Sequence, residues 1–535
     1  MAQHRYTGAA QLHDDAFCLC LTVDGNAATI DLPGFMRFRI PLELAPSGVY
    51  RVPPGAGPCL IELDFSTIPV TGAAHGHGGS GPVMLWPELS FDRAAFEPSN
   101  GAYRTGDGHE LFLGIRGDGP AAIPYLLDGD DIVRLHPTGP AVFAGERGEL
   151  VRLGRDELVV ERAGDRTLAR RFEPYRSQEA SFQAEGAELA GTLFMPHGAG
   201  PFPAVALVHG ASPGERGFYQ LYAHHFARCG IAALAYDRRG SGRSTGNAGS
   251  RLATRARDAA AAIEWLRRQP GIDPGRAGLW AFSNGTWSAP MVAAGITPVA
   301  FVVLTGAAGV SGAESEIHRK LTELRSWGGG PLLLNTVQRA WRTAYAYIGG
   351  GQWPAGVTPA EYDALIADLH ADSSLTAIPL ADYAVENPWL APIPPNMPAA
   401  ELQRRAGRSP DLAYDPIDDY PRITCPILFL VGEDDPNTPA EGATRIREAL
   451  IRSGNTRSTV EVVPGAGHYI NVTPPHIEGA SAAEAAAELH GLRFMPGYLE
   501  RMAEWILHAV GGQGRDEGPR PTDREPSRGG PPRPT

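Results

Sequence analysis

The sequence is poor in lysine and has no excess of positive charge. Lys320 is the single lysine among 47 basic residues, and 60 acidic residues bring the formal net charge to −13. A protein that binds nucleic acid without sequence preference needs a basic surface, so we expect no nucleic-acid partner. Because Lys320 follows Arg319 rather than a glycine, it does not complete a phosphate-binding loop of the Gly-Lys-Ser/Thr type, and a kinase motif fails for the same reason.

Cysteine is scarce as well. The five cysteines form no Cys-x-x-Cys pair, and their number is odd: Cys18, Cys20, Cys59, Cys229 and Cys425. This pattern argues against a zinc ribbon and against a disulfide framework. Reduced thiols in a cytoplasmic protein are the simpler interpretation. We expect neither a metal ion nor a cofactor.

Long hydrophobic runs are also missing. No uninterrupted apolar run approaches the roughly 18 residues that span a bilayer, and the segment Met1–Tyr6 opens no hydrophobic region of a signal peptide. We therefore expect a cytoplasmic protein without a membrane span. A chain of 535 residues is long enough for more than one domain and for a large core. The sequence does not indicate the oligomeric state.

Residues 1–172 have the pattern of a β-rich N-terminal domain. Short apolar runs alternate with turn residues, as at residues 17–23, 59–65 and 157–161. Alternation with glycine-rich breaks is typical of antiparallel strands. Nothing in this domain carries chemistry by itself, so we expect it to gate an active site or to bind substrate.

One stretch of this domain, residues 71–82, is rich in glycine and is expected to be a loop. His75 and His77 lie in it and could bind a metal ion. No third ligand is nearby, so a flexible loop is the favoured interpretation.

From residue 173 on, strand-like and helical segments alternate, which indicates βαβ units and a mostly parallel sheet. We expect this α/β core in two parts, residues 173–310 and residues 416–510. The expected strands are residues 204–208, 231–236, 277–282, 299–305, 426–431 and 459–463. The main expected helices of the core are residues 221–228, 252–269, 441–453 and 496–510. The remaining residues, 511–535, are rich in glycine and proline and are expected to be a disordered tail.

An inserted block at residues 311–415 interrupts the α/β rhythm. Its helical segments are expected at residues 314–327, 336–348 and 359–369. Such a block is expected to form a cap over the carboxyl edge of the sheet, where α/β proteins hold their sites. Its aromatic residues either line an acyl pocket or form the core of the cap itself: Trp327, Trp341, Tyr345, Tyr347 and Trp353.

The strongest chemical signal is a serine between an apolar strand and a helix, in Gly278-Leu-Trp-Ala-Phe-Ser283-Asn-Gly285. A serine at such a junction is held in a strained turn that projects its hydroxyl above the sheet, and small flanking residues let the turn close. Ala281 replaces the first glycine of the usual Gly-x-Ser-x-Gly pattern and is still small. Ser283 is therefore the candidate nucleophile, and a serine that only caps the helix is the weaker alternative.

A serine nucleophile needs a neighbouring base and a group that orients the base. His468 follows small residues just after the strand at residues 459–463, which favours a side chain presented at a tight turn. Three acidic residues after the strand at residues 426–431 compete for the orienting role: Glu433, Asp434 and Asp435. The order serine, acid, histidine is the order of α/β-hydrolases.

An oxyanion hole needs two backbone N–H donors. We expect one from Asn284, directly after the nucleophile. The other is expected from residues 208–212, which follow an early strand, and Ala211 is our choice. His209 in the same segment could be catalytic, but a structural role is favoured.

The segment from Ser181 to Val510 resembles the α/β-hydrolase superfamily, most of all its dienelactone-hydrolase and serine-aminopeptidase-like branch. The matching stretches are the entry strands at residues 191–196 and 203–210, the Asp-x-Arg-Gly-x-Gly-x-Ser-like loop at 236–246, the serine turn at 281–287, the Gly-x-x-Asp turn at 432–435 and the Gly-His pair at 467–468. The Gly-x-x-Asp turn favours Asp435 over Asp434. Ala281 and Thr286 depart from the family's glycines. The resemblance implies an α/β-hydrolase fold, a mostly parallel sheet flanked by helices, here with an inserted helical cap and an N-terminal β-rich domain.

The combined prediction is a serine hydrolase that cleaves carboxylic esters through an acyl-enzyme. Ser283 attacks the carbonyl carbon, His468 acts as base and Asp435 orients His468. The N–H groups of Ala211 and Asn284 hold the oxyanion, and water then resolves the acyl-enzyme.

Three alternatives stay open. A serine peptidase of the same fold, of the aminopeptidase or acylaminoacyl-peptidase kind, would suit an N-terminal domain that selects peptides by size. However, the β-rich region shows no regular repeat of about 40–50 residues, as propeller blades would give. A thioesterase would use the same machinery. A non-catalytic binding protein would not need all three residues of the triad. The expected partner is a small ester or peptide substrate.

Overall fold

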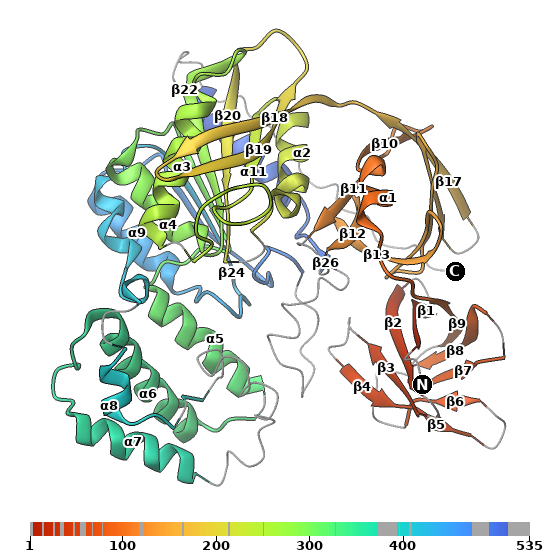
Figure 1. Cartoon of the computed structure of the whole chain (residues 1–535), viewed down its shortest axis with the longest axis horizontal. Coiled ribbons are helices and arrows are strands. Elements are labelled where there is room, and N and C mark those ends of the chain that lie inside the picture. The colour runs from red at the N-terminus through yellow and green to blue at the C-terminus, as the bar shows by residue number, and fades with distance from the viewer. Residues whose placement is uncertain are drawn as a thin grey trace, which may run out of the picture.

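The structure is a computed structural model. It describes residues 4–511 except 13–14, 25–26, 33–36, 46–48, 54–59, 67, 77–78, 117–121, 163–164, 212–213, 250, 327, 373–392, 395, 406–408 and 473–491. The tail predicted at residues 511–535 therefore lies, from residue 512 on, outside the described residues. In Figure 1 the α/β core lies at upper left, a group of helices lies below it, and two β-sheets from the N-terminal half lie at right.

The first sheet is antiparallel and is formed by the N-terminal residues. Its order is β4-β3-β2-β1-β9-β8-β7-β6-β5. The strands are β1 (His4–Leu12), β2 (Asp15–Asp24), β3 (Ala27–Leu32), β4 (Arg37–Pro41), β5 (Glu43–Leu44), β6 (Tyr50–Arg51), β7 (Leu60–Asp64), β8 (Val70–Gly76) and β9 (Gly79–Pro87). Alternate residues such as Leu19, Leu21 and Ile61 form its buried core.

The loop predicted at residues 71–82 is wrong for the residues that the structure describes, because residues 71–76 lie in β8 and residues 79–82 in β9. The glycines here allow neighbouring strands to lie close together. A Cβ at Gly72 would lie 2.0 Å from the carbonyl oxygen of Glu62 on β7. His75 accepts or donates a hydrogen bond at 2.7 Å to the Ser80 hydroxyl across the hairpin, and His77 lies outside the described residues.

The second sheet closes on itself. Its order is β12-β11-β10-β17-β16-β15-β14-β13-β26, and β12 also pairs with β13. The strands are β10 (Gly101–Thr105), β11 (Glu110–Arg116), β12 (Ile123–Asp128), β13 (Asp131–Gly139), β14 (Val142–Gly145), β15 (Leu150–Leu153), β16 (Glu157–Arg162), β17 (Asp165–Phe172) and β26 (Leu492–Arg493). The short helix α1 (Arg93–Phe96) precedes it. The pairing of β12 with β13 closes the sheet, and β26, from near the C-terminal end of the described chain, adds a short pairing with Asp131 and Ile132 of β13.

The third sheet has the order β18-β19-β21-β20-β22-β23-β24-β25. Its strands are β18 (Tyr175–Ala184), β19 (Ala187–Pro196), β20 (Phe202–Val208), β21 (Ala232–Tyr236), β22 (Ile272–Phe282), β23 (Val302–Thr305), β24 (Ile427–Gly432) and β25 (Thr459–Val463). β18, β19 and β21 pair antiparallel, and all pairs from β21 to β25 are parallel. Residues of β20 and β24 are apolar without interruption and are buried almost throughout. Such strands need helices on both faces of the sheet to keep them from water.

Helices cover both faces of the third sheet. Helices α3 (Leu252–Leu266), α4 (Gly285–Met291) and α9 (Gly442–Arg452) share one buried cluster with it. Helices α2 (Gln220–Arg228) and α11 (Tyr498–Gly511) share the other. This is the α/β-hydrolase fold, with β-rich sheets N-terminal to it, as the sequence predicted. None of the helices in the described part of the chain is long and apolar enough to cross a membrane.

The inserted block consists of helices with a core of their own. The helices are α5 (Gly312–Ser326), α6 (Pro331–Gly350), α7 (Pro359–Ala371) and the short α8 (Ala399–Gln403). They form one buried cluster, separate from the clusters of the sheet. The domain boundaries at residues 172, 310 and 415 stay a prediction.

Candidate active site

Ser283 lies directly after β22 and before α4, in a strained turn. Its φ angle is 49°, the left-handed region that residues with a Cβ seldom adopt. The turn is held by hydrogen bonds, because the Ser283 N–H donates to the Thr305 carbonyl at 3.0 Å and the Thr286 hydroxyl donates to the Ser283 carbonyl at 2.6 Å. A strained residue persists only where its surroundings fix it, and such positions occur often at functional sites.

Small residues let this turn form, as the serine motif predicted. A Cβ at Gly285 would lie 2.7 Å from the carbonyl oxygen of His209 and 2.8 Å from that of Val208. The chain therefore passes too close to β20 for any other residue. Ala281, in contrast, pairs with Val208 and is fully buried, so its methyl group has room.

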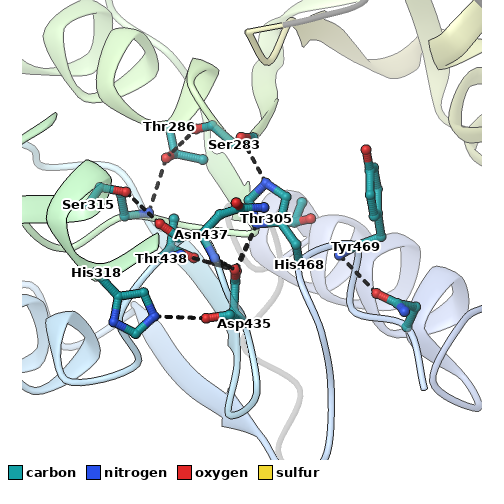
Figure 2. A network of polar contacts seen from close by, with 12 residues as sticks. Ser283, Thr286, Thr305, Ser315, His318, Asp435, Asn437, Thr438, His468 and Tyr469 are labelled. Carbon is teal, nitrogen blue, oxygen red and sulfur yellow. Dashed lines mark hydrogen bonds and ion pairs between the residues drawn. The ribbon is translucent and has the colours of Figure 1, made fainter. Parts of the chain in front are cut away.

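His468 lies between Ser283 and Asp435, as Figure 2 shows. Its Nε2 is 2.9 Å from the Ser283 Oγ, and its Nδ1 is 2.8 Å from Oδ2 and 3.0 Å from Oδ1 of Asp435. A carboxylate only accepts, so Nδ1 carries the proton and Nε2 of the neutral ring accepts from the serine hydroxyl. The imidazole is thus oriented to take the proton of Ser283.

Asp435 is the acid that contacts the histidine. It is 3% exposed, whereas Glu433 and Asp434 are exposed. The backbone N–H groups of Asn437 and Thr438 donate to its Oδ1 at 2.8 and 3.0 Å, and the Thr438 hydroxyl donates to Oδ2. Burial acts to raise the pKa of Asp435, but His468 and these donors outweigh it and lower the pKa below its ordinary value. The carboxylate therefore stays charged beside the imidazole.

The two amides predicted to hold an oxyanion, those of Ala211 and Asn284, line one cavity with Ser283 and His468. Neither amide N–H has an acceptor among the described residues. Arg238 fixes the first of the two segments, because its guanidinium donates to the carbonyl oxygens of Gly210 at 3.2 Å and Ala211 at 2.5 Å. A developing oxyanion requires two such N–H groups without acceptors close to the nucleophile.

The side chains behind these amides were not found from the sequence. The Gly210 N–H donates to the hydroxyl of Tyr219 at 2.8 Å, and Arg255 donates to the side-chain oxygen of Asn284. Tyr219 and Arg255 come from the 3₁₀ turn before α2 and from α3, so nothing in the local sequence links them to the serine.

His209 is buried among aromatic rings and does not face the nucleophile network. Its ring lies 4.6 Å from that of Tyr219 and 4.8 Å from that of Tyr236. Burial, with Arg238 and Arg255 nearby, lowers its pKa to about 3. A neutral imidazole whose Nε2 has no hydrogen-bond partner among the described residues fits a structural role.

The cavity above Ser283 has a volume of about 390 Å³, and both charged and apolar side chains form its wall. Four charged residues line it: Arg255, Glu316, Arg319 and Asp411. Arg319 pairs with Glu316 at 3.1 Å. Leu252, Trp287 and Leu412 supply apolar wall.

The aromatic residues of the inserted helices do not line this cavity, so the acyl-pocket alternative is wrong for those that the structure describes. Trp341 and Tyr345 stack at 4.8 Å inside the helical cluster, and Tyr347 packs on Trp353 at 4.2 Å. Trp353 also packs on Tyr362 of α7 at 5.5 Å, so the ring contacts connect α6 to α7 and form part of the core of the inserted block. Trp327 lies outside the described residues.

Helix α5 of the inserted block touches the turn of the acid (Figure 2). The His318 Nε2 donates to the carbonyl oxygen of Asp435 at 3.0 Å, and the Ser315 hydroxyl donates to that of Asn437 at 2.8 Å. No pattern in the sequence predicted these contacts. Only the hydrogen bonds of Thr438 to Asp435 follow a local sequence pattern, since an aspartate side chain often accepts from a residue two or three positions later.

No group of three or more His, Cys, Asp or Glu side chains that could hold a metal ion is found in the described ranges. The site as built consists of a hydroxyl, an imidazole, a carboxylate and two free amides. Such a set can perform acyl transfer.

Comparisons with curated proteins find short matches. A thiohydrolase of Arthrinium phaeospermum is 34% identical over 125 residues, which are 23% of this chain and 40% of that protein. The esterase FrsA of Escherichia coli is 44% identical over 52 residues, 10% of this chain and 13% of that protein. The chain thus spans at most two fifths of the length of these relatives.

Among solved structures, a dienelactone hydrolase from Anabaena variabilis has 14% identity and a TM-score of 0.32, covering 63% of this chain and 99% of that one. An esterase from Pyrococcus furiosus has 14% identity and a TM-score of 0.36, covering 63% and 94%. A family model described as the alpha/beta hydrolase family matches residues 205–486, more than half of the chain, and this range contains Ser283, Asp435 and His468. The resemblance predicted from the sequence is confirmed, and the chain belongs to the alpha/beta hydrolase family.

Proposed function

We propose that this protein is a serine hydrolase that cleaves carboxylic esters through an acyl-enzyme. The observation that carries the proposal is the chain of hydrogen bonds from Ser283 through His468 to Asp435. It lies at the wall of a cavity that also contains two amides without acceptors among the described residues.

In the proposed reaction His468 Nε2 takes the proton of Ser283 as Oγ attacks the ester carbonyl carbon. The N–H groups of Ala211 and Asn284 stabilise the oxyanion, and Asp435 stabilises the imidazolium. His468 then gives its proton to the leaving alkoxide as the C–O bond breaks. Water, deprotonated by His468, attacks the acyl-enzyme and releases the acid and free Ser283.

The size of the cavity and the charged residues in its wall support a preference for small acyl groups. A long alkyl chain that lies against Arg255, Glu316 and Asp411 would bury less apolar surface than one that meets only apolar side chains. A cavity of about 390 Å³ also suits a small ligand.

A second candidate, a thioesterase, is favoured by one finding, the 34% identity to a thiohydrolase over 125 residues. The same triad can attack either kind of carbonyl, so the leaving group has to be decided by measurement.

The test is hydrolysis of matched substrates by the wild type and by Ser283→Ala. The substrates are p-nitrophenyl esters from acetate to dodecanoate, acyl thioesters of the same acids and aminoacyl anilides. Turnover of short esters that Ser283→Ala abolishes supports the proposal. A higher kcat/KM for thioesters or anilides moves the assignment to a thioesterase or a peptidase. Equal ester turnover by wild type and Ser283→Ala would overturn it.

A further inference from the structure

The second β-sheet is packed onto the α/β core rather than held apart from it. Phe112 and Tyr125 of this sheet belong to the same buried cluster as Phe218, Tyr222 and Phe494 of the hydrolase part. The ring of Phe112 stacks at 4.3 Å on that of His224 in α2. A shared apolar core fixes the position of one part against the other.

The segment that carries His468 is tied to this sheet through the backbone. After His468 the chain forms an isolated bridge between Asn471 and Phe494, and the Val472 N–H donates to the Arg493 carbonyl at 2.8 Å. Arg493 lies in β26, which pairs with β13 of the second sheet. The Phe494 N–H donates to the Asp130 carbonyl at 2.8 Å. Arg493 and Phe494, which contact the segment after His468, are thus both bound to the N-terminal half of the chain.

A side chain of the second sheet reaches the same segment. Arg116, the last residue of β11, donates through its guanidinium to the Tyr469 hydroxyl at 2.9 Å. The guanidinium carbon also lies 4.1 Å from the ring centre of Phe218 and 5.1 Å from that of Tyr469. A cation between two aromatic faces is attracted to both, and the planar guanidinium can stack and donate at the same time.

Tyr469 connects Arg116 to the residues of the catalytic centre. It directly follows His468, lines the cavity above Ser283, and lies beside His468 in Figure 2. Its ring stacks on Phe282 at 4.9 Å with an interplanar angle of 23°, and Phe282 precedes the nucleophile. The position of one ring is thus coupled to both reacting side chains.

We propose that Arg116 is a positioning residue of the active site, supplied by the N-terminal β-region, which holds Tyr469 and through it the histidine segment. The inference rests on the proposed function, since it assigns the N-terminal region a part in that same site. Arg116 does not line the cavity, so it acts through Tyr469 and not on the substrate. A misplacement of about 1 Å of a catalytic group can cost roughly 100-fold in rate.

The experiment compares four variants of the full chain with the wild type: Arg116→Met, Arg116→Lys, Tyr469→Phe and the double variant Arg116→Met/Tyr469→Phe. Two rates are measured, the turnover of p-nitrophenyl acetate and the second-order labelling of Ser283 by a fluorophosphonate. We expect Arg116→Met to lower kcat about 10-fold or more with KM within about two-fold. Arg116→Lys, which keeps the cation, should restore part of the loss. The double variant should lose no more than the worse single variant, because both changes break one contact.

Arg104→Met is the matched control. Arg104 lies on the neighbouring strand β10, and its guanidinium carbon is 3.9 Å above the ring of Phe172, so it makes the same kind of contact away from the site. We expect this variant to keep the wild-type kcat and KM.

The outcomes separate this inference from the proposed function. A wild-type kcat in Arg116→Met and Tyr469→Phe, with Ser283→Ala inactive, overturns the inference alone. Should Arg116→Met fail to fold, Tyr469→Phe decides, because it removes only a hydroxyl. Turnover that survives Ser283→Ala overturns the proposed function and the inference with it. An equal loss in Arg104→Met would also overturn the inference, since the effect would then be general destabilisation.

Discussion

Nδ1 of His468 lies 2.8 Å from Oδ2 of Asp435, whereas the side chain of Asp434, one residue earlier, is exposed. Two adjacent carboxylates thus have opposite surroundings. We expect Asp435→Asn to lower kcat by about 10³-fold or more, because an amide nitrogen facing Nδ1 favours the wrong tautomer of His468. Steady-state kinetics on the folded variant measure this. Asp434→Asn is the matched control and should stay within about two-fold of wild type. A large loss in Asp434→Asn with a small one in Asp435→Asn would contradict the assignment.

Gly285 should tolerate no side chain. In Gly285→Ala the new methyl group meets the carbonyl oxygens of His209 and Val208 at 2.7 and 2.8 Å, so either the turn or β20 must shift. We expect a loss of about 2 kcal/mol or more in the free energy of unfolding, together with a loss of activity. In Gly350→Ala, at the end of α6, the methyl group meets nothing within 4 Å, so this control should be neutral or gain up to about 1 kcal/mol. Urea unfolding compares the two, and equal stabilities would refute the argument.

His209 makes the stability of the protein depend on pH. Its pKa is about 3 in the folded chain against an ordinary value of 6.5, so between these values the unfolded chain binds a proton that the folded chain does not. Its contribution is complete above pH 6.5 and is lost as the pH falls, by up to about 1.4 kcal/mol per pH unit.

The variant His209→Gln does not titrate in this range. From pH 7.5 to 4.5 its free energy of unfolding should therefore fall by about 2 to 3 kcal/mol less than that of the wild type. Chemical denaturation at several pH values gives the two slopes. An identical pH dependence of the free energy of unfolding in the two proteins would show that folding does not lower the pKa of His209.

The sequence predicted most of the core for a simple physical reason. Strands buried on both faces must be continuous apolar runs, as at residues 204–208 and 426–431, and the helices between them need amphipathic repeats. Ser283 and Asp435 follow such strands directly, so a local pattern sufficed to find them. The preference for Asp435 came from the Gly-x-x-Asp turn.

What the sequence missed depends on contacts between distant segments. The glycines of residues 71–82 indicated a loop, yet Gly72 is there because a neighbouring strand lies too close for a Cβ. The contact of Arg116 with Tyr469 joins the second sheet to the segment after His468, and that of His318 with Asp435 joins the inserted helices to the acid turn. No periodicity within one segment encodes which other segment it will meet.

The acyl preference should follow from the charged wall of the cavity. Among p-nitrophenyl esters we expect kcat/KM to be highest for acyl chains of about two to four carbons and to fall for octanoate and longer chains, because a long chain that lies against Arg255 and Asp411 buries little apolar surface there. Substituting Asp411 by leucine should shift the optimum toward longer chains. An optimum at dodecanoate in the wild type would show that the polar wall does not contact the acyl group.

Arg238 should matter although it does not touch a reacting atom. It holds the carbonyl oxygens of Gly210 and Ala211, so Arg238→Met frees the segment that presents the Ala211 amide. We expect kcat to fall about 10- to 100-fold with a small change in KM, because loss of a whole oxyanion donor costs about 10²- to 10³-fold. Arg276→Met, at a surface ion pair with Asp273, is the control. Equal kcat and KM values of the two variants would show that Arg238 is not needed to hold the segment that carries the Ala211 amide.

The strand β26 sets an order of events during synthesis. It pairs with Asp131 and Ile132 of β13, so this pairing can form only after Leu492 and Arg493 have been synthesised, long after the rest of the second sheet. The segment with His468 is anchored by the same pairing. The serine turn finds its partner at Thr305, whereas the segment with His468 is anchored through residues 492–493 and β13, so we expect the two parts of the site to form at different stages of folding.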